Sequence, residues 1–433
     1  RSTLILTLFP YTTLFRSHIR RAFAVAMSGR PGPVVLALPE DMLSTMADVA
    51  DAAPAPIPAA PDRTGQAGAA LDWLAEADRP LVVVGGPHWS AAAAADLATF
   101  AGRENLPVAL AFRRQDYLDN RHPSYAGDLN VGINPKLAKR MREADRLLVI
   151  GSRLGDIATQ GYALFDASGP RPKIAHIHAD ADEIGRVFTP DLSVVSDGPS
   201  FVAALAALNG TGKDWSDWTA AARADYLGWA KPFASPGDVK QEEVIAWLSA
   251  NLPEDAIVTN GAGNYAAWLH RYFTYKGYRT QLAPTSGSMG YGFPAAVSAS
   301  LENPEKTVVC LAGDGCFQMT LNEMSTAKQY GATPIVVVVN NGRYGTIRMH
   351  QEKHYPGRVS GTMLQNPDFA ALARAYGGYG ETVLKTEDFA AAFSRAKTSN
   401  LPAVIELVVD EQALGTSLTL DAARAAGEAA KKK

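Results

Sequence analysis

Two stretches of the sequence place an oxygen-bearing side chain directly after an apolar run. Asp314 follows the run 307–312, and Asn341 follows the run 334–339. Each run has the length and composition of a parallel strand that is buried on both faces. The spacing between them leaves room for one helix and a return strand, and ligands of open α/β sheets bind beyond the carboxyl ends of strands. We therefore expect the two side chains to be neighbours at one sheet edge.

Such a pair suits a magnesium ion that is bridged to a diphosphate. A carboxylate, an amide oxygen and a backbone carbonyl are hard ligands, and magnesium completes its shell with phosphate and water. Gly313 and Gly315 allow close backbone approach, and the helix that follows offers free N–H groups to a phosphate. The predicted metal ligands are Asp314, Asn341 and the backbone carbonyl of Arg343.

Each part has a simpler interpretation when it is taken alone. Asp314 could cap a helix, and the Asn340–Asn341 pair could form a turn. A second glycine-rich segment, 286–296, carries Met289 and leads into a helix with Pro294 in its first turn. Alone, Met289 would be an ordinary core residue. The whole set in this order favours the cofactor site.

In this order, Gly-Asp-Gly, a helix, an apolar strand and Asn-Asn resemble the signature of thiamine-diphosphate-dependent enzymes. Segment 286–296 resembles the family's Gly-x-Met-Gly loop, in which the residue at the Met289 position props the cofactor into its bent shape. The likeness is strongest to acetolactate synthase large subunits. It implies thiamine diphosphate and Mg²⁺ as cofactors, with the cofactor-binding residues Gly263, Asn264, Met289, Gly313, Asp314, Gly315, Cys316, Asn341 and Tyr344.

The alternation of apolar runs with helical segments predicts an α/β fold with two doubly wound parallel-sheet domains plus the remnant of a third. The expected divisions are a central Rossmann-like domain at 64–208, a connector at 209–238, a diphosphate- and Mg-binding domain at 239–415, and a tail at 416–433. Segment 18–49 resembles the end of the family's pyrimidine-binding domain. It contains a helix at 18–27 and an apolar run, 34–38, that suits a buried strand, and an Ala- and Pro-rich linker follows at 50–63.

The first 17 residues resemble translated vector sequence and are expected to be non-native. In the resembling family, a Glu of the pyrimidine-binding domain activates the cofactor, and we expect that residue upstream of His18. Neither Glu40 nor Glu323 matches its position, so no catalytic residue is assigned. The chain as given is therefore expected to be inactive by itself.

The resemblance implies decarboxylation of a 2-oxo acid, ending in aldehyde release or in carboligation to a second carbonyl. Acetolactate synthases carry a Met and a Trp after Asn-Asn, where this chain has Thr346 and His350. This difference argues against acetolactate as the product. Candidate substrate residues are Thr346, Arg348 and His350, since a cation there could face a carboxylate. The alternative is a solvated basic stretch.

A flavin is typical of acetolactate synthases, and segment 151–156 stands where flavin contacts would be; a plain strand-end turn is the alternative. FAD is therefore left open. Two functions from other classes also compete. One is a non-catalytic thiamine-diphosphate-binding or scaffolding protein. The other is a nicotinamide dehydrogenase, which is disfavoured because no Gly-x-Gly-x-x-Gly follows a strand of the central unit.

Composition narrows the remaining classes. The 433 residues suit two or three domains, and 41 basic against 44 acidic residues give a net charge of −3, which offers no basic surface for nucleic acid. No apolar run reaches the length of a membrane span. Two cysteines in the whole chain argue against a disulfide framework and favour the cytoplasm. The resemblance implies a homodimer or homotetramer for the full-length form.

Overall fold

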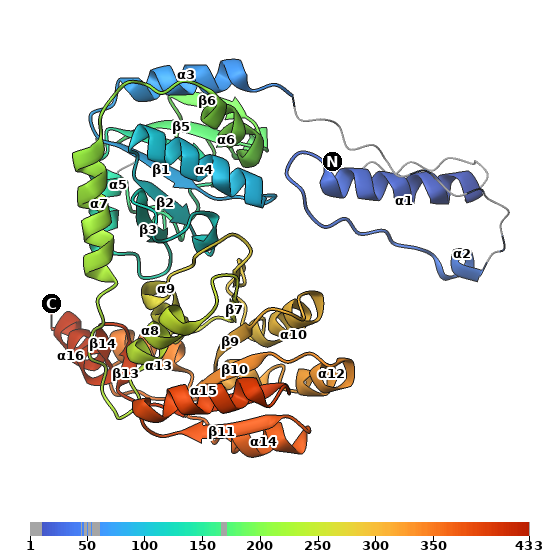
Figure 1. Cartoon of the computed structure of the whole chain (residues 1–433), viewed down its shortest axis with the longest axis vertical. Helices are drawn as coiled ribbons and strands as arrows, with labels where there is room; N and C mark the ends of the chain where they lie inside the picture. The colour runs from blue at the N-terminus through green and yellow to red at the C-terminus, as the bar shows by residue number, and fades with distance from the viewer. Residues whose placement is uncertain are drawn as a thin grey trace.

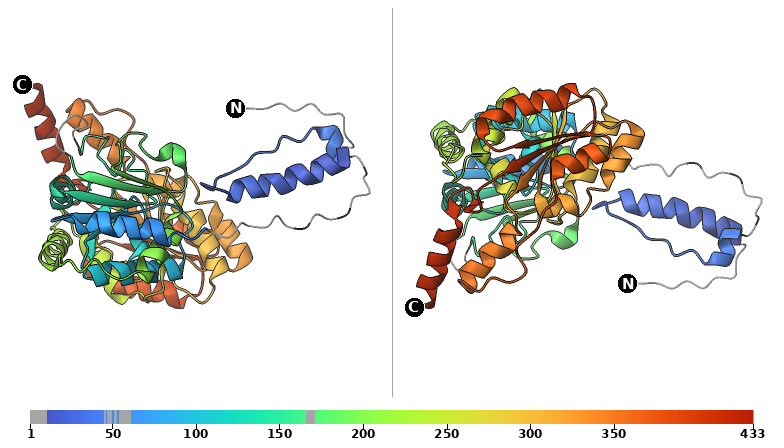
Figure 2. Two further views of the ribbon diagram at one scale, coloured as in Figure 1. Left: turned by 90° about the horizontal axis from the view of Figure 1, so that it is seen from above. Right: turned by 90° about the horizontal axis from the view of Figure 1, so that it is seen from below.

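The computed structural model describes residues 11–44, 46, 50, 53, 61–165 and 171–432. Two α/β domains follow one another along the long axis of the molecule, and the N-terminal segment lies to one side of both (Figure 1). The views from above and below show the same separation of that segment (Figure 2). Among the described residues, no helix is long and apolar enough to cross a membrane.

The central domain is built on a six-stranded parallel sheet. Its strands run in the order β3-β2-β1-β4-β5-β6, the order of dinucleotide-binding folds, and the order reverses between β1 and β4. Helices α3, α4 and α6 share one apolar core on one face, and α5 packs on the other face. The strands are β1 (Pro80–Val84), β2 (Val108–Ala111), β3 (Tyr125–Leu129), β4 (Arg146–Ile150), β5 (Lys173–His178) and β6 (Leu192–Val195). The helices are α3 (Thr64–Ala75), α4 (Ala91–Glu104), α5 (Pro135–Glu143) and α6 (Gly198–Ala207).

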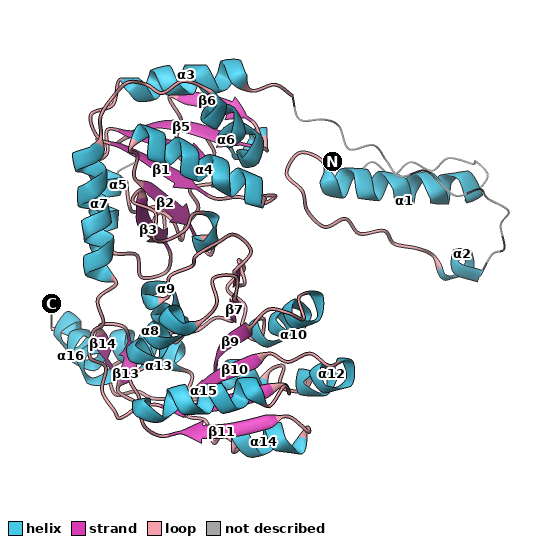
Figure 3. Ribbon diagram, viewed as in Figure 1, coloured by secondary structure: helices cyan, strands magenta, loops and turns pink. Residues whose placement is uncertain are grey.

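A helix in the predicted connector leads to the second domain. This helix, α7 (Ser216–Trp229), runs alongside β3. The second domain has a parallel sheet in the order β11-β12-β10-β9-β7-β8, covered by helices on both faces (Figure 3). Its strands are β7 (Ile257–Asn260), β8 (Gln281–Leu282), β9 (Val308–Gly313), β10 (Ile335–Asn340), β11 (Tyr379–Val383) and β12 (Ala403–Val408).

One face of this second sheet is covered by α8, α9 and α15, and the other face by α10, α12 and α14. A small antiparallel pair, β13 (Ala413–Gly415) and β14 (Leu418–Thr419), precedes the last helix. The helices are α8 (Gln241–Asn251), α9 (Ala266–Tyr272), α10 (Gly292–Glu302), α11 (Asp314–Gln318), α12 (Glu323–Tyr330), α13 (Gly345–His354), α14 (Phe369–Ala375), α15 (Phe389–Thr398) and α16 (Leu420–Lys431).

The predicted fold class of two doubly wound parallel sheets is confirmed. The apolar runs identified in the sequence form the inner strands, because a strand with neighbours on both sides and helices on both faces must be apolar throughout. Strand β3 has no such signal, since its five residues include Gly127 and Asp128.

The N-terminal segment differs from its prediction. Helix α1 (Tyr11–Met27) begins seven residues before the predicted start at His18, and a short helix α2 (Glu40–Ser44) follows. The prediction of a buried strand at 34–38 is wrong: this stretch forms no strand, and Val35 is 89% exposed. An apolar run becomes a buried strand only when other strands pair with it, and none of the described strands does. Residues 1–10 and most of the predicted linker lie outside the described residues.

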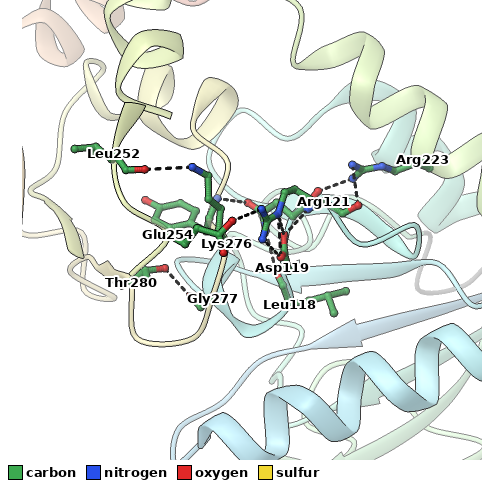
Figure 4. A network of polar contacts seen from close by, with 11 residues as sticks. Leu118, Asp119, Arg121, Arg223, Leu252, Glu254, Lys276, Gly277 and Thr280 are labelled. Atoms are coloured by element: carbon green, nitrogen blue, oxygen red, sulfur yellow. Dashed lines mark hydrogen bonds and ion pairs between the residues drawn. The ribbon is translucent and has the colours of Figure 1, made fainter. Parts of the chain in front are cut away.

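A seam of hydrogen bonds joins the two domains. Asn120 of the central domain donates its backbone N–H to the Tyr275 carbonyl at 2.9 Å, and its Oδ1 accepts from the Tyr275 N–H at 3.0 Å. Arg121 lies beside them and forms ion pairs with Asp119 and with Glu254 of the second domain (Figure 4). The arginine and Glu254 are exposed, so these ion pairs add little stability. The buried bonds of Asn120 fix the orientation of the domains.

Two carboxyl groups are buried beside this seam. Burial raises the pKa of Asp116 to about 6 and that of Asp128 to about 7. Asp128 Oδ1 accepts a hydrogen bond from Gln115 Nε2 at 3.3 Å, and Oδ2 is buried without a partner among the described residues. The Asn130 side chain lowers the pKa of Asp128, but by less than burial raises it. The ionised form of Asp128 is therefore poorly compensated.

We predict that Asp128→Asn stabilises the protein at neutral pH. An unfolded Asp titrates near 3.9. Because the folded pKa is higher, the native state binds more protons between pH 4 and about 7, and stability falls as pH rises through that window. At pH 8 the variant should be more stable than wild type by about 1–2 kcal/mol of unfolding free energy and should therefore unfold at a higher temperature. The difference should vanish near pH 4. Thermal melts across this range measure it; a pH-independent difference would contradict the explanation.

Candidate cofactor and metal site

The order of the second sheet reverses between β7 and β9, and crevices at such reversals are where ligands bind in open α/β sheets. Asn260 pairs with Leu311, and Val339 pairs with Gly313. This register brings the ends of β7, β9 and β10 to one level. The turns that begin at Gly261, Asp314 and Asn341 therefore meet at one edge, as predicted for the latter two.

Asp314 opens α11 immediately after β9, and it is only 3% exposed. Its Oδ1 accepts from the Gly315 N–H at 2.8 Å, and its Oδ2 accepts from the Gly342 N–H at 2.9 Å and from Asn366 Nδ2 at 2.7 Å. Burial raises the pKa of this carboxyl in spite of these donors. No lysine or arginine among the described residues pairs with it. The site therefore contains a buried carboxylate that a cation would stabilise.

Asn366 is a member of this cluster that the sequence analysis missed. Its Nδ2 donates both to Asp314 Oδ2 and, at 2.8 Å, to Asn340 Oδ1. The other end of the Asn340 amide donates to Glu406 Oε1 at 2.7 Å. Asn340, at the end of β10, thus links this strand to β12 and to the loop that carries Asn366. Asn366 lies in a loop without an apolar pattern around it, so no local signal could have revealed it.

Asn341 differs from Asn340 in its environment. Its Oδ1 accepts one hydrogen bond, from the Arg343 N–H at 3.2 Å, and the amide oxygen retains a second lone pair. The Arg343 side chain is buried, and its guanidinium forms an ion pair with the Glu411 carboxylate. Of the groups of Arg343, only the backbone carbonyl therefore remains a candidate metal ligand.

Aromatic rings lie so close to three of the predicted glycines that a side chain at those positions would clash with them. A Cβ at Gly315 would lie 2.6 Å from Tyr344 Cε1, and a Cβ at Gly313 would lie 2.8 Å from Tyr265 Cδ1. Gly263 has φ +152° and would place a Cβ 2.8 Å from the same Tyr265 ring. The structure therefore brings the predicted residues Gly313, Gly315 and Tyr344 together, with Tyr265 among them.

Cys316 links three parts of the site. Its Sγ accepts from the Tyr265 hydroxyl at 3.2 Å and from the Gly290 N–H at 3.1 Å. A Cβ at Gly261 would lie 2.4 Å from that sulfur. Met289 precedes Gly290 and packs against the apolar core beside α8 and α9. The loop that carries Met289, the turn after β7 and the start of α11 are therefore held against one another.

The substrate candidates separate into two groups. Thr346 Oγ1 accepts from the Asn264 N–H at 3.0 Å and donates to Asn264 Oδ1 at 2.8 Å, so these two predicted residues meet. Arg348 is buried and donates to Glu352 Oε1 through Nε at 2.9 Å and Nη2 at 2.6 Å. His350 is exposed and stacks on His354. Neither Arg348 nor His350 bonds to the Asp314 cluster, and the Arg348 guanidinium already has a carboxylate.

Comparison with known families agrees with this geometry. The model described as the thiamine pyrophosphate enzyme C-terminal TPP-binding domain matches residues 261–407, which contain the Asp314 cluster. The central domain of the same enzymes matches residues 67–205. The chain belongs to the thiamine pyrophosphate enzyme family.

Relatives of this thiamine pyrophosphate enzyme are acetolactate synthase large subunits. That of Corynebacterium glutamicum is 31% identical over 417 residues, which cover 91% of this chain and 65% of the relative. The isozyme 2 large subunit of Escherichia coli is 28% identical, over 90% of this chain and 70% of the relative. The chain thus spans about two thirds of their length. The thiamine diphosphate-dependent 4-hydroxybenzoylformate decarboxylase of Rhodococcus jostii RHA1 shares the fold, with a TM-score of 0.70, 23% identity and coverage of 91% of this chain and 74% of that chain.

We predict that Asp314→Asn abolishes magnesium-dependent binding of thiamine diphosphate while the protein stays folded. The amide keeps the shape and an acceptor oxygen but removes the charge that holds a divalent ion. Calorimetry with thiamine diphosphate and excess Mg²⁺ should show a loss of more than about 100-fold in affinity.

The matched control is Asp368→Asn, which changes an exposed carboxylate that caps α14 through the Ala371 N–H. Asn is an equally good cap, so this variant should bind like wild type. Unchanged affinity in Asp314→Asn would show that the metal is held elsewhere.

Proposed function

We propose that this protein is a magnesium- and thiamine-diphosphate-dependent enzyme that cleaves a 2-oxo acid. The fragment is then released as an aldehyde or joined to a second carbonyl. The observation that carries the proposal is the Asp314 carboxylate. It is buried at the switch point of the domain that matches the TPP-binding model, and no lysine or arginine among the described residues pairs with it. Acetolactate synthase relatives favour the carboligation outcome, since that is the reaction in their name.

The residues present fit the proposed cofactor. Asp314, Asn341 and the Arg343 carbonyl would supply three oxygens to Mg²⁺, which leaves positions for diphosphate and water. The turn at Gly263 and Asn264 would lie against the diphosphate, and Met289 would support the ring end. When bound, thiamine diphosphate supplies the electron sink for decarboxylation.

The chain's own residues would position this group. Thr346 holds Asn264 by two hydrogen bonds, and Cys316 holds the turn after β7 against the Met289 loop. Positioning of this kind removes an entropic cost from the reaction. The buried Tyr265 fills the space between these turns.

A carboxylate that activates the cofactor is not assigned within this site. Glu406, the glutamate that bonds to the cluster, uses one oxygen for Asn340 and the other for Thr382. We propose that the activating Glu belongs to a pyrimidine-binding domain, contributed by a partner subunit in a homodimer or homotetramer. Residues 18–433 by themselves should then show no 2-oxo acid turnover.

Three further proposals concern cofactor, location and alternative function. The flavin expectation stays a prediction. A cavity of about 260 Å³ lies at the β1/β4 switch point, and residues of the turn at 151–156 line it. Pockets that enclose drug-sized ligands measure roughly 300–1,000 Å³, so a whole flavin nucleotide would extend beyond this cavity.

We propose a cytoplasmic location, which the two free and buried cysteines support. The competing proposal, a non-catalytic scaffold, requires cofactor binding without turnover in the full-length protein.

We predict that the full-length protein forms little acetolactate from pyruvate and decarboxylates a larger 2-oxo acid more efficiently. Thr346 replaces the Met of acetolactate synthases and its hydroxyl is held by Asn264, which leaves a smaller and more polar wall. A panel of 2-oxo acids should give at least a tenfold higher kcat/KM for a substrate other than pyruvate, a difference of roughly 1.4 kcal/mol.

Asp314→Asn in the same assay is the control for cofactor dependence. Efficient acetolactate production with no better substrate would contradict the specificity proposal, and the absence of turnover with bound cofactor would favour the scaffold.

A further inference from the structure

Arg113 is a central-domain residue that reaches the candidate site across the seam. It follows β2 and precedes the short 3₁₀ helix Gln115–Tyr117, and it is only 6% exposed. Its φ of +58° lies in the left-handed region, which costs energy for a residue with a side chain and is concentrated at functional positions. Nη1 donates to the Gly261 carbonyl at 3.1 Å, in the turn after β7.

That carbonyl is part of the site described above. A Cβ at Gly261 would lie 2.4 Å from Cys316 Sγ and 3.7 Å from the Gly290 N–H nitrogen. Cys316 is two residues beyond Asp314, and Gly290 follows Met289. The guanidinium therefore lies beside the loops proposed to hold the cofactor.

Within the described part of the chain, no carboxylate compensates the Arg113 charge. Among the described residues it forms no ion pair, and its Nε is buried without a hydrogen-bond partner. The groups that act on it electrostatically include Tyr265, Tyr275, Tyr291 and Cys316, none of which is a carboxyl group, and burial lowers the pKa of Arg113. Its guanidinium also lies 4.8 Å from the Phe112 ring centre.

The charges of other arginines in this chain with little exposed side chain are compensated by ion pairs with carboxylates. Each of four forms an ion pair with a carboxylate, namely Arg140 with Asp225, Arg146 with Glu76, Arg343 with Glu411 and Arg348 with Glu352. An unpaired buried charge is strongly destabilising. Arg113 departs from this pattern at a place where a ligand is expected.

We propose that Arg113 binds an oxyanion at the end of β7, either of the cofactor diphosphate or of the 2-oxo acid carboxylate. Guanidinium groups suit both, since they bind carboxylates and phosphates through paired N–H donors. The assignment rests on the proposed function, because that function supplies the two oxyanions. Nη1 on the Gly261 carbonyl sets the position of the guanidinium, and Nε has no hydrogen-bond partner among the described residues.

The test compares Arg113→Gln and Arg113→Lys with wild type and with Arg121→Gln. Arg121 is a matched control, because it lies at the same seam but is exposed and paired with Asp119 and Glu254. The probes are thiamine diphosphate with excess Mg²⁺, and then oxamate, a non-reactive analogue of pyruvate, added to the loaded protein. Calorimetry reports both affinities, and thermal melts report the stability of the ligand-free protein.

Arg113→Gln should lose about 10- to 100-fold in affinity for one probe, Arg113→Lys should lose less, and Arg121→Gln should match wild type. A loss with thiamine diphosphate assigns the diphosphate, and a loss confined to oxamate assigns the carboxylate. Ligand-free Arg113→Gln should also melt higher than wild type, since a buried uncompensated charge is removed. Both affinities within twofold of wild type would overturn this proposal alone, whereas a wild-type protein that does not bind thiamine diphosphate would overturn it together with the proposed function.

Discussion

The burial of the Asp314 carboxylate is the constraint on which the site depends. A carboxylate removed from water is costly unless donors or a cation compensate it. Here three N–H donors from Gly315, Gly342 and Asn366 compensate it in part, and its pKa is still raised. The donors come from the start of α11, the turn after β10 and the loop before α14, and the first two meet because parallel strands β9 and β10 end at the same level. The sheet register thus creates a negatively charged position that suits a divalent cation.

The seam between the domains adds a charge of the opposite sign. Asn120 and Tyr275 lock the central domain against the second domain, and this orientation presents Arg113 to the turn after β7. Among the described residues, no lysine or arginine pairs with Asp314 and no carboxylate pairs with Arg113, and the two side chains do not pair with one another. On the proposals above, a metal-bound diphosphate would supply a cation to Asp314 and an oxyanion to Arg113, whereas a carboxylate substrate would supply only the oxyanion. On the proposal that Arg113 binds an oxyanion, the central domain would contribute to the site as well as support it.

Much of this arrangement follows from local sequence patterns. Inner parallel strands are continuous apolar runs, so the positions of Asp314 and Asn341 at strand ends could be predicted from the residues before them. Asn366 and Arg113 could not, because each lies in a loop and reaches the site only through tertiary packing. The run 34–38 shows the converse error, since burial depends on neighbours that a local pattern does not reveal. The ion pair of Arg348 could have been predicted from the sequence, because Glu352 stands four residues later on the same helix and such pairs commonly form.

The central claim, that Asp314 and Asn341 hold the metal of a thiamine-diphosphate site, is tested most directly by locating the metal. Crystals of the protein grown with thiamine diphosphate and Mn²⁺, a substitute for Mg²⁺ with an anomalous signal, give its position without reference to activity. The account predicts one strong peak at about 2.0–2.3 Å from an Asp314 carboxylate oxygen, Asn341 Oδ1 and the Arg343 carbonyl, with diphosphate oxygens completing the shell. A peak at another place, with Asp314 still bonded only to Asn366 and the backbone, would contradict it.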